Sequence, residues 1–281
     1  SRAVRFDGKE FRTILPKDGL IGGIVDGLLV STVNNVYPTE DGTIWFATAH
    51  GISHYNGTSF LNFNTDYQTI FRQFYEDAAG RLWIASNEGI YRYDSSTTVS
   101  FTKKDGVGPI NDGDHSRKFY IDRTGNLWYS SADRGVVRYD GKYSQVFNVA
   151  EGLPHSNVRD ILQSKDGAMW FATWGGGISR YDGEKFVNFS EPQIPDNKAR
   201  AIYEDKDGTL WFGTEKTLIH YNGQKSFKIY SVAEKEAEKK TGDLPFGAIS
   251  RIFRGSQNYL WIVSILETGQ GTRIVRFNDK K

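Results

Sequence analysis

The apolar and polar residues of this chain alternate with the short period of β-strands. Between residues 158 and 190, four runs rich in β-branched and aromatic side chains read VRDILQS, AMWFAT, ISRYD and KFVNFS. The turns between them, KDG, WGGG and GE, are rich in Gly and Asp. Short apolar runs separated by such residues are typical of neighbouring antiparallel strands. The pattern therefore predicts an up-and-down sheet of four strands.

The same pattern returns six times along the chain. Six fourteen-residue segments align without a gap, at a mean interval of about 43 residues, and end in Trp45, Trp83, Trp128, Trp170, Trp211 and Trp261. A second aromatic landmark follows the first five tryptophans after ten or eleven residues, at Tyr55, Tyr93, Tyr139, Tyr181 and Tyr221. The sixth repeat reaches its landmark only at Phe277, after the insertion SILETGQGT. Repeats of this length are typical of propeller blades.

The repeat determines the predicted architecture. A single four-stranded sheet of this size cannot bury both of its faces, whereas six such sheets packed around an axis can. We predict an all-β fold, a six-bladed β-propeller of four-stranded antiparallel blades, that occupies residues 1–281 as a single domain. Residues 11–15 are predicted to close the last blade by adding its outer strand. Seven blades are the alternative, because residues 4–6 form a surplus copy of a third strand.

The repeated aromatic and acidic residues have structural interpretations. The tyrosines are expected to fill the gaps between neighbouring blades, where aromatic rings pack well, rather than to stack on carbohydrate. The acidic turn residues are expected to accept hydrogen bonds from nearby backbone N–H groups. Calcium binding is the alternative, but their spacing does not resemble a calcium loop. These turn residues are Glu40, Asp41, Asp77, Asp122, Asp205 and Asp207.

Composition excludes several classes of function. Lys and Arg number 35 and Asp and Glu 34, so the net charge is +1 and no basic excess exists for nucleic acid or an anionic membrane surface. No apolar run approaches the roughly 20 residues that span a bilayer. Cysteine is absent, which excludes disulfides, thiolate metal sites and cysteine nucleophiles. We therefore expect no nucleic-acid partner and no membrane contact from this chain itself.

Propeller geometry predicts where a ligand would bind. The first strand of each blade lines the channel, and the loops that enter it share one rim with the loops between second and third strands. The segments that differ most between repeats fall on this rim, at residues 16–32, 103–115, 191–198, 231–247 and 266–271. Since loops carry binding more often than the scaffold does, we place the candidate site there.

One position on this rim is rich in arginine. Eleven residues before each repeat tryptophan stand Asn34, Arg72, Arg117, Arg159, Arg200 and Ser250. Four arginines in a ring would bind carboxylates, sulfates or phosphates through paired hydrogen bonds. In the alternative interpretation, each arginine pairs with an acidic neighbour and only ties blades together.

Other rim residues add to the candidate site. Trp174 is the only tryptophan outside the repeat position and precedes three glycines, so it could stack on a sugar or planar ligand, or cap the apolar edge of its blade. His50 and His155 share the rim, and His115 aligns with the entrances of first strands. These histidines lack the spacing of metal ligands, so we predict no metal and no cofactor. The insert SVAEKEAEKKTGDLP, residues 231–245, has a helix-forming composition and predicts a short charged surface helix.

The segments YEDKDGTLWFGT and GGGISRYDG closely resemble the two-component regulator propeller repeat, and EGLPHSNVRDI resembles the junction that precedes its blades. The resemblance extends over nearly the whole chain and is more specific for fold than for function. It implies the periplasmic or extracellular sensing part of a histidine kinase or hybrid two-component regulator, often one that senses glycans. The sequence departs from such proteins in having no transmembrane helix, kinase or DNA-binding segment.

The function predicted from these observations is that of a non-catalytic sensor module for an anionic or glycan ligand, either a small molecule or an oligosaccharide. A propeller lyase or glycosidase is the first alternative, and it would need an acid and a base on the rim. Glu88, Glu151, Glu215 and Glu267 lie there but form no recognisable pair, so no catalytic residue is assigned. A protein–protein interaction platform, including self-association, is the second alternative.

Overall fold

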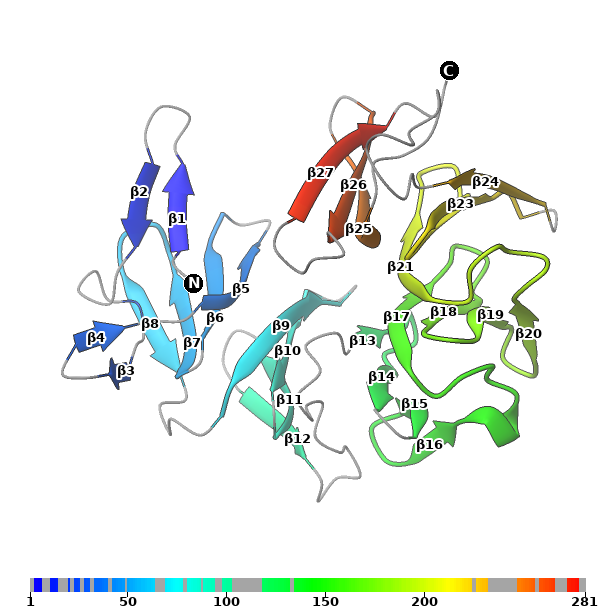
Figure 1. Cartoon of the computed structure of the whole chain (residues 1–281). Coiled ribbons are helices and arrows are strands. Elements are labelled where there is room, and N and C mark those ends of the chain that lie inside the picture. The colour runs from blue at the N-terminus through cyan, green and yellow to red at the C-terminus, as the bar shows by residue number, and fades with distance from the viewer. Residues whose placement is uncertain are drawn as a thin grey trace. The chain divides into compact units, whose positions relative to one another are not determined.

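The computed structural model forms two compact units, Ser1–His115 and Ser116–Lys281, which are described separately below (Figure 1). The described residues are 3–6, 11–14, 20, 23–25, 28–30, 33–39, 42–48, 50–63, 69–77, 80–86, 88–93, 98–102, 118–131, 134–223, 226–231, 247–255, 258–265 and 272–277.

The first unit contains two hairpins and two four-stranded antiparallel sheets. The hairpins are β1 (Ala3–Phe6) with β2 (Phe11–Ile14), and β3 (Gly23–Val25) with β4 (Leu28–Val30). One sheet consists of β5 (Val33–Pro38), β6 (Ile44–Thr48), β7 (Gly51–Tyr55) and β8 (Phe60–Phe63). The other consists of β9 (Phe71–Glu76), β10 (Leu82–Ser86), β11 (Gly89–Tyr93) and β12 (Thr98–Thr102). In both sheets, strands adjacent in sequence are paired.

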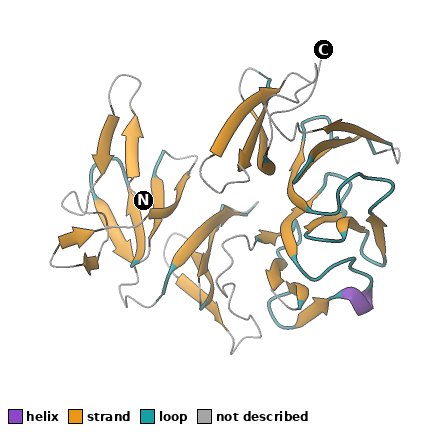
Figure 2. Cartoon of the chain, in the orientation of Figure 1, coloured by secondary structure: helices purple, strands orange, loops and turns teal. Residues whose placement is uncertain are grey.

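The second unit contains three four-stranded sheets and one of three strands, again paired in chain order (Figures 1 and 2). They are β13 (Phe119–Ile121), β14 (Leu127–Ser131), β15 (Gly135–Tyr139) and β16 (Ser144–Phe147); β17 (Val158–Gln163), β18 (Met169–Thr173), β19 (Gly177–Tyr181) and β20 (Phe186–Phe189); β21 (Ala199–Glu204), β22 (Leu210–Thr214), β23 (Thr217–Tyr221) and β24 (Phe227–Ser231); and β25 (Ala248–Arg254), β26 (Leu260–Ile265) and β27 (Thr272–Phe277). A single 3-10 turn, η3 (Val149–Glu151), stands out from the strands of the described chain in Figure 2.

These sheets confirm the predicted all-β class and the repeat of antiparallel blades. The four runs between residues 158 and 190 are the strands β17 to β20, and six repeat sheets fit six blades. In the described residues, β2 pairs with β1. Closure of the last blade by residues 11–15 concerns both units and stays a prediction, as does the single domain. The helix predicted at residues 231–245 falls almost wholly outside the described residues.

One segment predicted as a rim loop contains regular structure. Within residues 16–32, β3 and β4 form an antiparallel hairpin in which Val25 lies opposite Leu28. The two residues between them are Asp26 and Gly27. An Asp-Gly pair between two apolar runs is a strong hairpin signal, because both residues tolerate the backbone angles of a tight turn. The variable segment at residues 16–32 therefore contains a hairpin in its described part, and its place on the rim stays a prediction.

Aromatic packing between successive sheets follows the predicted pattern. The repeat tryptophan of one sheet lies against the third-strand aromatic residue of the next, at centroid distances of 4.9–6.2 Å. Such pairs contribute about 0.5–1.5 kcal/mol each beyond their buried area. The interpretation of the third-strand aromatics as wedges is thereby confirmed within each unit. The pairs are Trp45–Tyr93, Trp128–Tyr181, Trp170–Tyr221 and Trp211–Phe277.

The acidic turn residues do accept local backbone N–H groups, and Asp77 and Asp122 also hold the tryptophans of their sheets. Asp122 accepts the backbone N–H of Asn126 at 2.9 Å and the indole N–H of Trp128 at 2.8 Å. Asp77 accepts the Trp83 indole in the same way, at 2.7 Å. Burial alone would raise the pKa of Asp122, but hydrogen bonds from Trp128 and its neighbours together lower it. These turns therefore fix the ring orientation of core residues.

Candidate functional site

The arginine-rich position of the repeat is a β-bulge. In five sheets the register between first and second strands skips one residue, and the skipped residue is always the one eleven positions before the repeat tryptophan. A bulge bends its strand and re-aims the side chain of the extra residue, and bulges are common beside functional sites. The bulged residues are Asn34, Arg72, Arg159, Arg200 and Ser250.

Two of these bulges bring arginines onto the same tryptophan. The guanidinium carbons of Arg159 and Arg200 lie 4.9 and 4.3 Å from the centroid of the Trp174 ring. The ammonium group of Lys198 lies 5.2 Å from it. A cation over an indole is stabilised by about 0.5–1 kcal/mol at an exposed site and about 2 kcal/mol when desolvated. Trp174 thus gathers three positive charges from two neighbouring sheets.

Backbone contacts hold Trp174 at the junction of those sheets. Its N–H donates to the carbonyl of Asn157 at 2.8 Å, and an isolated antiparallel bridge pairs it with Lys198. The next residues, Gly175 and Gly177, both donate to the carbonyl of Asn197. The loop between β18 and β19 is therefore bound both to the entrance of β17 and to that of β21. This confirms, within the second unit, that these two kinds of loop share one end of the sheets.

The glycines after Trp174 are required by close packing. A Cβ atom on Gly176 would lie 2.8 Å from the carbonyl carbon of Pro154, closer than real side chains approach backbone. Gly175 has a φ of +122° and packs against the imidazole of His155. Only residues without a side chain let this loop fold onto Pro154 and His155, so the glycines place Trp174.

One carboxylate lies among the three cations. Glu215 is 2.9 Å from the ammonium of Lys198 and 3.3 Å from a terminal nitrogen of Arg200. The hydrogen bond and charge of Glu215 raise the pKa of Lys198. We name Arg159, Trp174, Lys198, Arg200 and Glu215 the Trp174 site. The alternative in which arginines pair with acidic neighbours thus holds for Arg200, although the five residues together keep an excess of positive charge.

The other residues at the predicted ring position make different contacts or are not described. Asn34 donates its side-chain amide to the carbonyl of Phe71 at 2.7 Å and so joins two sheets of the first unit. Ser250 donates to the carbonyl of Val263 in its own sheet. The side chain of Arg72 and the whole of Arg117 lie outside the described residues. The structure therefore brings two of the four arginines together, and a complete ring stays a prediction.

The two rim histidines of the prediction lie in different units. His155 accepts the backbone N–H of Asn157 through Nδ1 at 3.0 Å, so in its neutral form the proton resides on Nε2. His50 donates its backbone N–H to the hydroxyl of Thr48 at 3.1 Å, whereas His115 is not described. Among the residues that the structure describes, no group of three His, Asp or Glu side chains could hold a metal ion.

A half-buried carboxylate follows the Trp174 site residue Arg159 in the chain. Asp160 follows Arg159 in β17 and accepts the backbone N–H of Ile202, in the neighbouring sheet, at 2.9 Å. Burial raises the pKa of Asp160, against the opposing charges of Lys118 and Arg251. Sequence reasoning missed this contact, because a single Asp inside a strand gives no signal of a partner some forty residues away.

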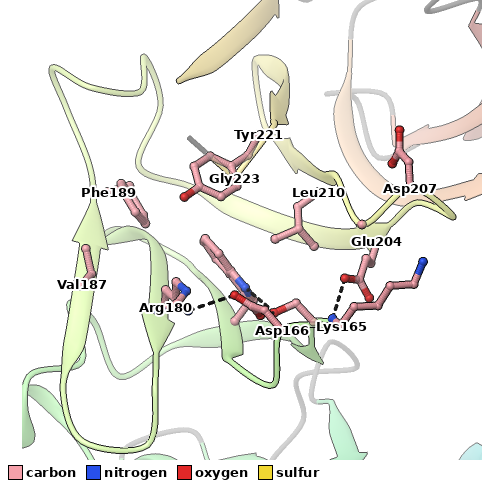
Figure 3. Close-up of a pocket in the computed structure, with 13 residues that line it drawn as sticks. Lys165, Asp166, Arg180, Val187, Phe189, Glu204, Asp207, Leu210, Tyr221 and Gly223 are labelled. Carbon is pink, nitrogen blue, oxygen red and sulfur yellow. Dashed lines mark hydrogen bonds and ion pairs between the residues drawn. The ribbon is translucent and has the colours of Figure 1, made fainter. Parts of the chain in front are cut away.

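Sequence reasoning also missed a cavity at the other end of the same two sheets (Figure 3). It has a volume of about 450 Å³ and reaches from the turns after β17 and β21 to the third and fourth strands. Asp166 and Arg180 form an ion pair of 3.0 Å on one of its walls. The prediction assigned these constant turns to folding alone. A cavity between two sheets depends on their packing, which no single repeat encodes.

Comparison with known proteins agrees with this architecture. The family model described as the two component regulator propeller matches residues 152–175 and 193–216. These two segments are two-component regulator propeller repeats. The two matched segments contain every residue of the Trp174 site: Arg159 and Trp174 lie in the first, and Lys198, Arg200 and Glu215 in the second.

Solved propeller structures are similar over most of this chain. The extracellular domain of a hybrid two-component system from B. thetaiotaomicron matches with a TM-score of 0.67 and 22% identity, over 99% of this chain and 39% of that one. Virginiamycin B lyase from Staphylococcus aureus matches with a TM-score of 0.60 and 15% identity, over 88% and 84%. PorZ from Porphyromonas gingivalis, a surface component of the type-IX secretion system, gives 0.59 and 14%, over 86% and 40%.

At these identities the similarity concerns the fold. This chain spans about two fifths of the length of the B. thetaiotaomicron domain. No curated protein matches the sequence significantly. A helix able to cross a membrane is not found in the described part of the chain.

Proposed function

We propose that this two-component regulator propeller domain is the ligand-sensing part of a signalling protein, and that the Trp174 site binds an anionic group of a small molecule or oligosaccharide without catalysing a reaction. The observation that carries the proposal is that Arg159, Lys198 and Arg200 lie around one tryptophan, where Glu215 pairs with Lys198 and Arg200. The similarity to an extracellular domain of a hybrid two-component system supports a periplasmic or extracellular location.

The geometry of the cations suits an anion better than a neutral sugar. A guanidinium group presents several donors in one plane and recognises carboxylate, sulfate or phosphate with two parallel hydrogen bonds. Arg200 makes one contact of 3.3 Å with Glu215, which does not use this bidentate capacity. We infer that the anion binds at the outer edges of the two guanidinium groups.

Trp174 has a different role in this proposal from the one that the sequence indicated. Its ring is already contacted by three cations at 4.3–5.2 Å. A sugar stacked on the ring would have to displace them. We therefore assign Trp174 to holding the arginines in place, since an aromatic face restricts where a guanidinium can move.

Binding of a trimer of galacturonic acid, measured by calorimetry and by thermal shift, tests the proposal, with the neutral galactose trimer as the matched probe. We expect the acidic trimer to raise the melting temperature and the neutral one not to, because a ligand that binds only the native state stabilises it. Inorganic sulfate and phosphate serve as smaller anionic probes.

Two double variants test whether the anion binds at the Trp174 site. Arg159→Ala combined with Arg200→Ala is expected to abolish the shift. The control removes the same charge elsewhere: Arg92→Ala with Arg138→Ala, two arginines that also lie over tryptophan rings, at 5.6 and 5.8 Å, but in third strands. Equal binding by both double variants, with native circular dichroism, would discard the Trp174 site as the receptor.

A further inference from the structure

The cavity between the sheet of β17–β20 and that of β21–β24 contains an ion pair that is accessible from outside. Its volume of about 450 Å³ falls in the range of roughly 300–1,000 Å³ that small-molecule sites occupy. The side chains of Asp166 and Arg180 pair at 3.0 Å and are 58% and 27% exposed. Figure 3 shows Val187 and Phe189 on the side of Arg180, and Leu210, from the next sheet, on the other side. The cavity therefore combines one accessible charged pair with apolar side chains from both sheets.

Arg180 lies differently from the equivalent residues of other sheets. The third-strand residue that is paired in register with the repeat tryptophan usually covers its ring. Arg180 is paired with Trp170 in the same way, but within the described chain its guanidinium contacts Asp166 and not the tryptophan ring. In the other sheets, Arg92 and Arg138 lie over Trp83 and Trp128 at 5.6 and 5.8 Å, and His54 and His220 stack on Trp45 and Trp211 at 4.3 and 4.2 Å.

The turn after β17 explains this difference. Asp166 stands four residues before Trp170, and its charge attracts Arg180 into the turn. The carboxylate is itself held in place, because the Ser164 hydroxyl donates to it while accepting the Trp170 indole N–H at 3.0 Å. Since Arg180 does not cover Trp170, this ring borders the cavity. At the position of Asp166, the sheets of Arg92 and Arg138 have the uncharged residues Ala79 and Thr124.

The charged residues that line the cavity balance one another. Asp166 and Arg180 form one pair. Glu204 accepts the backbone N–H of Lys165 at 2.6 Å, and the ammonium of Lys165 donates to two backbone carbonyls of the neighbouring turn. Figure 3 shows Asp207 turned away from the cavity, and its carboxylate accepts hydrogen bonds within its own turn. The cavity therefore has no excess charge that would favour an anion or a cation.

The ion pair offers a hydrogen-bond donor and an acceptor side by side. Within the described residues, the guanidinium of Arg180 makes one hydrogen bond, from a terminal nitrogen to Asp166, so its other N–H groups are unused. The oxygen of Asp166 that accepts Arg180 has no second donor in this part of the chain, although a carboxylate oxygen can accept two. A neutral group that both accepts and donates would satisfy the two residues together.

We propose that this cavity binds a primary carboxamide carried on a short apolar body. The amide oxygen accepts a hydrogen bond from Arg180, the amide N–H donates to Asp166, and the body lies against Val187 and Leu210. Hydrogen bonds to charged groups are the stronger ones, so one amide gains two of them. A sugar would bury further hydroxyls against apolar walls, which is unfavourable. This site is separate from the Trp174 site and does not depend on the proposed function.

Ligand-observed NMR on the whole chain tests the proposal with three probes of nearly the same shape: benzamide, benzoate and benzamidinium. We expect benzamide to bind at least about tenfold more tightly than either charged probe, because each of those loses one hydrogen bond to a charged group. A benzoate places a negative charge on Asp166, and a benzamidinium places a positive charge on Arg180. The probe cis-1,2-cyclohexanediol represents a sugar and should bind more weakly than benzamide.

Two variants locate the amide. Asp166→Thr copies the residue found at this position in the sheet of Arg138, and Arg180→Met removes the donor. Each should weaken benzamide binding about tenfold, as loss of a hydrogen bond to a charged group does. The matched control is Arg138→Met, which removes an arginine at the same position of another sheet and should leave binding unchanged.

The outcomes that contradict the proposal are distinct. Absence of benzamide binding would overturn it, as would equal or tighter binding of either charged probe or of the diol. Benzamide binding within twofold of the native protein in both Asp166→Thr and Arg180→Met, with native circular dichroism, would also overturn it. Arg159→Ala with Arg200→Ala should keep benzamide binding, and loss in that variant would contradict the separation of the two sites.

A peptide arm separates the two sources of the amide, a small molecule and a glutamine side chain. A nine-residue peptide with glutamine at its centre is compared with benzamide and with the same peptide carrying glutamate. A glutamine peptide that binds more than tenfold more tightly than both identifies a polypeptide as the source, because flanking residues then contribute. A glutamine peptide that binds no more tightly than benzamide identifies a small amide.

Discussion

The ion pair between Asp205 and Arg254 allows a sharp test of how neighbouring sheets are held together. Arg254, in β25, donates from Nε to Asp205, in the turn after β21, at 2.9 Å, and a terminal nitrogen contacts the second carboxylate oxygen. The two side chains are only 5% and 9% exposed. Breaking a buried pair leaves an uncompensated charge and costs about 3–5 kcal/mol. Arg254→Ala should destabilise the protein by this amount.

A pair whose arginine is exposed gives this prediction its control. Arg81 contacts Asp77 at 2.8 Å; the carboxylate is 4% exposed but the arginine is 36% exposed. Ion pairs that are open to solvent contribute about 0.2–1 kcal/mol. Since about 1 kcal/mol shifts the melting temperature by roughly 2–4 °C in chains of this size, Arg254→Ala should lower it by about 6–20 °C and Arg81→Ala by no more than about 4 °C. Calorimetry and urea unfolding measure both. Equal, small losses would refute the argument that burial of the arginine determines how much each pair contributes.

A nearby tryptophan narrows the loss of stability expected for Arg254→Ala. The indole N–H of Trp211 is buried without a hydrogen-bond partner in the described chain, whereas Trp83 and Trp128 donate to the aspartate of their own turn. Asp205 instead accepts hydrogen bonds from Arg254, which occupy the carboxylate that the Trp211 indole would otherwise use. In Arg254→Ala, Asp205 becomes free to accept this indole, so the loss should fall near the lower limit of the range.

Three further predictions concern single residues. The fold lowers the pKa of Asp122, so its carboxylate stabilises the native state above the ordinary pKa of 3.8, and this stabilisation is lost as the pH falls below that value. In Asp122→Asn, the free energy of unfolding, measured in urea from pH 2.5 to 7, should therefore fall less steeply at acid pH. Gly176→Ala places a Cβ atom 2.8 Å from Pro154 and should cost about 1–3 kcal/mol, seen in urea unfolding, together with a loss of anion binding. Asn34→Ala removes the bond to Phe71 and should cost about 1 kcal/mol by the same measurement, whereas an unchanged midpoint would show that this bond does not hold its two sheets.

The fold was predictable because its information is local and repeated. Each strand of β17–β20 has its own apolar run and its own turn, and six copies average out the irregularities of any one. The position of Arg159 and Arg200 was predictable for the same reason, since it is a fixed distance from the repeat tryptophan. The bulge at that position was not, because a bulge depends on the register of the paired strand and not on the residue itself.

Features that depend on two sheets at once were not predictable from single repeats. Tyr221 belongs to the sequence YNG, as does Tyr55, yet Tyr55 bonds its glycine carbonyl and Tyr221 does not. The three residues of this turn are the same in both repeats, so they do not reveal the difference. Trp174 was found as a rim residue, but the cations that cover its ring come partly from the next sheet.

The Trp174 site and the cavity both lie at the junction between the sheets of β17–β20 and β21–β24. The junction is joined at the Trp174 end by the bridge between Trp174 and Lys198, and near its middle by the bond from Ile202 to Asp160. At the cavity end, Lys165 donates its backbone N–H to Glu204. Three links spaced along one interface hold the two sheets together, so the Trp174 site has side chains from both sheets in place before a ligand binds. Preorganisation of this kind reduces the cost of ordering side chains on binding. A sensor built on this junction would therefore transmit binding through contacts made by the ligand itself or by the rest of the protein, and not through sliding of these two sheets.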